Sequence, residues 1–102
     1  MDDQNKTRVI VDSDLEDLVP DFLVRKKEDV DTIVSLLENG DFGQIRILGH
    51  SMKGAGGGYG FHRITEIGAI IEDAALIKNR DKILEIAGVL RDYLGNIEVV
   101  YE

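Results

Sequence analysis

Apolar residues recur at helical spacing in four segments of the chain, and turn-forming residues separate the segments. The first helix is predicted to begin at Pro20 or Asp21 and to end at Asn39-Gly40, a pair typical of a left-handed C-terminal cap. Asp41 is then the candidate N-cap of a second helix, which runs from Phe42 into the glycines after residue 55. The apolar stripe of the first helix comprises Leu23, Val30, Ile33, Val34 and Leu37, with Lys26 and Lys27 extended along its edge.

Two further helices follow the glycine-rich break. The third carries an apolar face of Ile64, Ile67, Gly68, Ile71, Ala74 and Ala75. The fourth begins at Asn79 or Asp81 and repeats Ile83, Ile86, Leu90, Leu94 and Ile97 at three- and four-residue steps.

The two ends of the chain carry weaker signals. Ser13 and Glu16 have capping-box spacing and Pro20 interrupts a continuous helix, so a short helix is expected over residues 14–19. The runs 8–11 and 98–101 favour extended structure. We therefore predict an all-α fold, an antiparallel up-and-down four-helix bundle with a short extra N-terminal helix. Residues 1–12 form a tail and residues 13–102 the domain.

Charge and composition restrict the choice of partner. The formal net charge of −8 disfavours nucleic acid and anionic membrane surfaces, which would repel the protein. The chain contains no cysteine, no apolar stretch long enough to span a membrane and no signal-peptide pattern. We expect a cytoplasmic, monomeric domain that meets another protein.

The second helix exposes a histidine. On a helical wheel, Phe42, Ile45, Leu48, Met52 and Ala55 form the core stripe, and Gly49 and Gly56 lie within it. His50 lies roughly 150° from the centre of this stripe, on the solvent side. Arg46 and Lys53 flank it along the helix, and its outward face also carries Gly43, Ile47, Gly54 and Gly57.

The glycine at position 54 favours a functional histidine. A glycine inside a helix costs about 0.5–1 kcal/mol relative to alanine. Helical side chains lean toward the N-terminus, so the absence of a side chain at Gly54 uncovers His50. Lys53 supplies a cation near any anion that forms on the ring. An exposed imidazole is largely unprotonated at neutral pH and is then a nucleophile.

Two other features have simpler interpretations. Tyr59 and Phe61 in the glycine-rich break are expected to close the end of the core. A phosphate-cradling loop is rejected because no strand precedes it and no Lys-Ser/Thr ending follows. His62 is interpreted as structural or incidental, and no metal site is expected.

The segment that begins at His50 resembles a known signature. Residues 50–61 read HSMKGAGGGYGF, which resembles the His-x-x-Lys-Gly motif of histidine-containing phosphotransfer (Hpt) domains. The resemblance extends through residues 14–18, 41–42 and 64–75. The family's polar hydrogen-bonding residue near the turn has no match here.

The resemblance implies a function. His50 would accept a phosphoryl group from the aspartate of one response-regulator receiver domain and pass it to another, in a bacterial-type two-component phosphorelay. Lys53 would stabilise the phosphate and Gly54 allow access, and Arg46, Ile47 and Gly57 would contribute to docking. The protein would need no cofactor of its own, because the receiver supplies the carboxylate and Mg²⁺.

Several alternatives remain open. The chain has no nucleotide-binding loop, so it is not expected to bind ATP or act as an autonomous kinase. It is either a free-standing phosphocarrier or a domain of a hybrid sensor histidine kinase. The alternative function is a docking module of the same fold that binds a receiver or kinase domain without exchanging phosphate.

Overall fold

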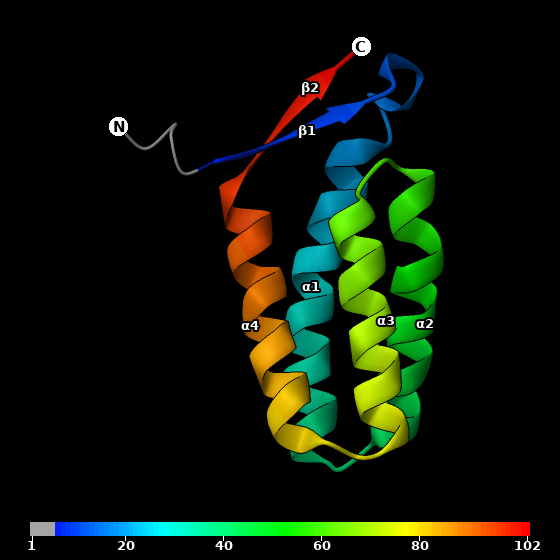
Figure 1. The fold of residues 1–102 in the computed structure, drawn as a ribbon, viewed down its shortest axis with the longest axis vertical. Helices are drawn as coiled ribbons and strands as arrows, with labels where there is room; N and C mark the ends of the chain where they lie inside the picture. The colour runs from blue at the N-terminus through cyan, green and yellow to red at the C-terminus, as the bar shows by residue number, and fades with distance from the viewer. Residues whose placement is uncertain (1–5) are drawn as a thin grey trace.

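The computed structural model describes residues 6–102 and contains four long helices packed side by side (Figure 1). In chain order these are α1 (Val19–Glu38), α2 (Phe42–Gly58), α3 (His62–Leu76) and α4 (Arg80–Asn96). In Figure 1 each helix runs in the opposite direction to the one before it. The predicted four-helix fold is confirmed.

The helix ends follow the turn signals in the sequence. Asp41 caps α2 by accepting a hydrogen bond from the Gln44 amide at 3.1 Å. Asn79 caps α4 in the same way, with the Lys82 amide at 3.1 Å. Gly40 has a φ of +69°, the left-handed conformation predicted after α1. The short connections keep consecutive helices in contact.

One face of each helix is buried in a common core. The predicted faces of α3 and α4 are buried, except that Ile97 is half-buried. In α1, Leu23 and Val34 are only half-buried, and Phe22, which the predicted stripe omits, is almost fully buried. Lys26 is buried too, and its ammonium donates to Asp29 at 2.8 Å. Within residues 6–102, no helix combines the length and apolar composition needed to cross a membrane.

Aromatic rings close one end of the core, as predicted. The Phe22 ring stacks on Tyr59, with ring centroids 4.2 Å apart, and on Phe61 at 5.6 Å. Phe61 is fully buried and precedes the first residue of α3. The glycine-rich break therefore positions rings, and Gly60, with a φ of +88°, makes the turn between them.

The predicted short N-terminal helix is reduced to one 3-10 turn at Ser13–Leu15. Its cap is Asp12, which accepts from the Asp14 amide at 2.8 Å, and α1 begins at Val19, one residue before Pro20. Nucleating a helical turn fixes several dihedral angles for one hydrogen bond, and tertiary packing must offset that cost. The turn contains no buried residue, so tertiary packing does not provide enough stabilisation to extend it into a helix.

The chain ends form a two-stranded parallel sheet at one end of the bundle (Figure 1). β1 (Thr7–Val11) pairs with β2 (Ile97–Tyr101) along their whole lengths. The sequence indicated two extended segments but not their pairing. Val11 is buried against the core, so part of the predicted tail is ordered structure. Residues 1–5 of that tail lie outside the described residues.

Candidate functional site

His50 lies in the middle of α2 on the outer surface of the bundle. Its side chain is 69% exposed, as the helical wheel predicts. Within the same helix, Ile45 and Met52 are fully buried, so the two faces of α2 are clearly separated. The imidazole is therefore accessible to another protein.

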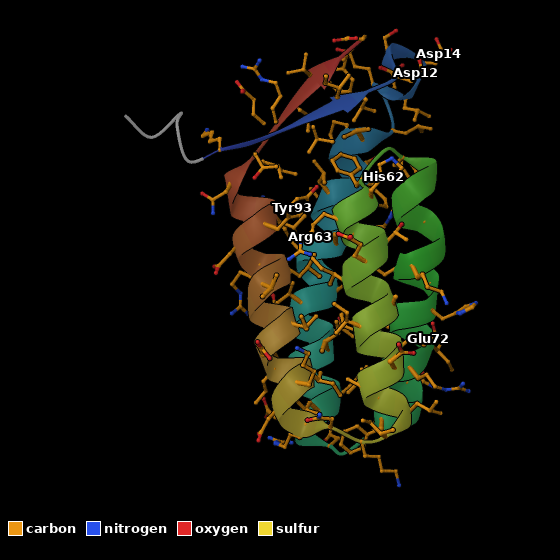
Figure 2. All side chains as sticks on the ribbon, viewed as in Figure 1. Asp12, Asp14, His62, Arg63, Glu72 and Tyr93 are labelled. Carbon is orange, nitrogen blue, oxygen red and sulfur yellow. The ribbon has the colours of Figure 1, made fainter. Side chains whose placement is uncertain are left out.

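A carboxylate from α3 contacts both the histidine and the neighbouring lysine. Glu72 Oε2 lies 2.9 Å from His50 Nδ1, and Glu72 Oε1 lies 2.8 Å from Lys53 Nζ. Figure 2 shows Glu72 on the outer side of α3, next to α2. Its side chain is 20% exposed, whereas that of Lys53 is 42% exposed. One carboxylate thus contacts the side chains of both His50 and Lys53.

Glycines bring α3 close enough for this contact. A Cβ atom on Gly68 would lie 2.5 Å from the Lys53 amide nitrogen and 2.7 Å from the Gly49 carbonyl oxygen. A Cβ on Gly49 would lie 2.8 Å from the Glu72 amide nitrogen. These separations are too short for any side chain, so α2 and α3 meet backbone to backbone. Glu72 follows Gly68 by one helical turn and therefore faces α2 beside His50.

The charges in this contact reinforce each other. Hydrogen bonds from Lys53, and secondarily from His50, lower the pKa of Glu72 below its ordinary value of 4.5. The same contact raises the pKa of Lys53 above 10.5. At neutral pH Glu72 is therefore ionised and can only accept hydrogen bonds. The proton of a neutral His50 must then lie on Nδ1, which leaves the lone pair on Nε2.

Of the remaining predicted residues, Arg46 and Ile47 lie beside the imidazole, and Gly54 and Gly57 follow it along α2 by about one and two helical turns. A surface hollow of about 300 Å³ is lined by Arg46, Ile47, His50 and Glu72. Ile47, a large apolar side chain beside the histidine, is 58% exposed. A Cβ on Gly54 would meet nothing within 4 Å, so the helix surface there is open. Gly57 is also exposed, but it lies beside Thr65, with 3.6 Å between its ideal Cβ and Oγ1.

Sequence reasoning missed Glu72, although it placed Gly49 and Gly68 on buried faces. Two buried glycines on consecutive helices are the signal that these helices approach closely, which brings the edge residues of α3 within reach of His50. His62 is exposed at the first residue of α3 and makes no side-chain hydrogen bond within residues 6–102. The same residues contain no cluster of three or more His, Asp or Glu side chains suited to a metal ion.

Comparison with known proteins is consistent with this geometry. The family model of the Hpt domain matches residues 17–99, which include all four helices and the first residues of β2. No curated protein and no solved structure matches the chain significantly. Because the family model covers most of its length, the chain belongs to the Hpt domain family.

Proposed function

We propose that this protein is a phosphocarrier of a two-component phosphorelay, with His50 as the residue that carries the phosphoryl group. Hpt domains serve as phosphotransfer modules in phosphorelays, where they interact with receiver domains and kinases. The observation that carries the assignment is the exposed imidazole whose Nδ1 is engaged by Glu72. This contact occupies Nδ1 and leaves Nε2 as the nitrogen available for reaction.

The transfer step follows from this tautomer. Nε2 of His50 attacks the phosphorus of an aspartyl phosphate on a receiver domain. The new bond joins Nε2 to phosphorus, the bond between phosphorus and the aspartate oxygen breaks, and the aspartate leaves as a carboxylate. The phosphorylated ring retains its Nδ1 proton, and Glu72 stabilises the positive charge that develops on it. A second receiver reverses these bond changes.

Lys53 supports the same phosphoryl transfer and contacts the other oxygen of the Glu72 carboxylate. Its ammonium lies one helical turn after His50 and is held by Glu72 Oε1 at 2.8 Å. In this position it neutralises part of the charge on a phosphoryl group bound to the ring. The receiver supplies the Mg²⁺ and the attacking or leaving carboxylate, so the protein needs no cofactor of its own.

The hollow beside His50 provides the contact with the receiver. Ile47 contributes an exposed apolar surface, Arg46 a cation, and Gly54 an unobstructed approach. The same features also serve the alternative function, in which the module binds a receiver or kinase domain without accepting phosphate. We place the protein in a bacterial-type relay in the cytoplasm, as a monomer.

The experiment is phosphoryl transfer from a purified receiver domain phosphorylated with acetyl phosphate. The matched variants are His50→Gln and His62→Gln, because both histidines are exposed and, among residues 6–102, only the first contacts a carboxylate. The wild type and the His62 variant should gain acid-labile phosphate, and the His50 variant should gain none. Equal labelling of the His50 variant would overturn the assignment. Binding without labelling of the wild type would favour the docking module.

A further inference from the structure

A second surface hollow lies at the end of the bundle where the two strands pair. It has a volume of about 440 Å³ and lies between residues 7–10 of β1 and the side of the bundle end that carries Gly60, Arg63 and Tyr93. Figure 2 shows Arg63 of α3 and Tyr93 of α4 closer to this end of the bundle than Glu72. β1 precedes the segment that matches the Hpt family model. The hollow is therefore lined in part by a strand that lies outside the matched segment.

The backbone of β1 has an unpaired edge on this side. In a parallel ladder, alternate residues direct their amide and carbonyl groups toward the partner strand. The Val11 carbonyl accepts from the Glu102 amide at 2.9 Å, so Val9 and Val11 face β2. Arg8 and Ile10 then direct their amide and carbonyl groups away from β2. No turn, loop or helix cap within residues 6–102 donates a backbone hydrogen bond to these groups or accepts one from them, although the Ile10 carbonyl oxygen lies only 3.7 Å from an ideal Cβ on Gly60.

The hollow is cationic in an acidic protein. Arg8 and Arg63 line it, although the formal net charge of the chain is −8. Their present partners are exposed carboxylates at 3.6 Å, from Glu98 to Arg8, and at 3.5 Å, from Glu66 to Arg63. Exposed ion pairs of this kind contribute little and can be displaced. The surface thus favours a ligand that brings its own carboxylates.

We propose that the open edge of β1 binds an extended acidic segment of a partner protein. The segment would add a third strand, using the amide and carbonyl groups of Arg8 and Ile10. Its carboxylates would face Arg8 and Arg63. β2, which pairs with the opposite edge of β1, has the composition expected of such a segment. It is a mostly apolar strand, and its one carboxylate, Glu98, lies beside Arg8.

Other occupants agree less well with these features. Nucleic acid would be repelled by the overall charge. A second copy of this chain would have to offer a strand edge: its β1 carries Arg8 and would repel the cations of the hollow, and its β2 offers one carboxylate, Glu98, which already pairs with Arg8 of the same chain. An acidic strand from another protein meets neither obstacle. Its binding would also leave His50 free, because His50 lies about 12 Å along α2 from the end that faces the strands.

The test is a titration of the ¹⁵N-labelled, unphosphorylated protein with a capped peptide of alternating valine and glutamate, followed by amide chemical shifts. Saturable shifts should centre on Thr7–Ile10, Gly60 and Arg63, with none at His50. A peptide with glutamine in place of glutamate should bind about tenfold more weakly, since it loses charge-assisted hydrogen bonds. N-methylation of the peptide backbone should also abolish binding, because it removes strand pairing.

The protein variants separate a specific site from general attraction. Arg63→Glu should weaken binding about tenfold or more, whereas Arg63→Lys should retain part of it. Arg46→Glu, an equal charge change at the distant hollow, should leave the affinity for this peptide unchanged. Absence of saturable shifts at β1, equal binding of the glutamine peptide, or dimerisation at the same edge would overturn the proposal. None of these results depends on whether His50 accepts phosphate.

Discussion

The contact between α2 and α3 predicts an unusual response to alanine at a helical glycine. In most helices, replacing glycine by alanine stabilises the protein by about 0.5–1 kcal/mol. At Gly68 the new methyl group would lie 2.5 Å from the Lys53 amide nitrogen and 2.7 Å from the Gly49 carbonyl oxygen. Both are backbone atoms, which cannot rotate away as a side chain can. The helices would therefore have to separate.

The expected magnitude follows from two opposing terms. Ordinary contact distances are about 3.5–4.0 Å, so the helices must move apart by about 1 Å or more. Overpacking of this kind costs about 1–3 kcal/mol, which exceeds the gain in helix propensity. Gly68→Ala should then lose about 1–2 kcal/mol, and its Tm should fall by roughly 4–16 °C. Separation should also weaken the contact of Glu72 with His50 and Lys53.

The assay is urea and thermal unfolding followed by circular dichroism, with Gly88→Ala as the matched control. Gly88 lies inside α4, where an added Cβ would meet nothing within 4 Å. The control should gain about 0.5–1 kcal/mol. If Gly68→Ala were as stable as the wild type, the close approach of α2 and α3 would be refuted, and with it the explanation for the position of Glu72.

Four further predictions concern the site. Glu72→Gln should slow phosphoryl transfer about ten- to a hundredfold in single-turnover assays, because a charge-assisted hydrogen bond to the ring is lost; an unchanged rate would exclude Glu72 as a positioning residue. The stability difference between wild type and this variant should be present at neutral pH and disappear in two ranges. It should be lost as pH falls through the native pKa of Glu72, which lies below 4.5, because the carboxylate becomes protonated. It should also be lost as pH rises through the native pKa of Lys53, which lies above 10.5, because the ammonium loses its charge. A stability difference that persists at pH 2 in denaturation curves would contradict the ion pair. Ile47→Glu should leave stability unchanged and raise the Kd for a receiver about tenfold by calorimetry, whereas an unaltered Kd would remove this side chain from the interface. Gly54→Glu should fold normally, since that position is open, and should still slow transfer; transfer at the wild-type rate would refute the access argument.

The helices could be predicted because their signals are local. Asp41 and Asn79 cap helices through amides three residues away, and Gly40 ends α1 within the turn that the sequence marks. The exposure of His50 also follows from α2 alone, since a helical wheel needs no knowledge of neighbouring helices. These features depend on residues close together in the chain.

The missed features depend on distant residues. β1 and β2 pair across almost the entire chain, and each strand alone indicates only extended structure. Glu72 is 22 residues from His50, and its carboxylate reaches the ring only because glycines let two backbones touch. Phe22 is buried because rings from the α2–α3 turn stack on it, which the periodicity of α1 cannot reveal.

The most direct test is to identify the nitrogen that carries the phosphoryl group. Protein labelled with ¹⁵N at histidine would be phosphorylated by a receiver domain, and long-range proton–nitrogen and phosphorus NMR would locate the new bond. The hydrogen bond from Nδ1 to Glu72 predicts phosphorylation at Nε2 of His50, with Nδ1 still protonated. A phosphoryl group on Nδ1 of His50, on His62, or on neither histidine would contradict the account.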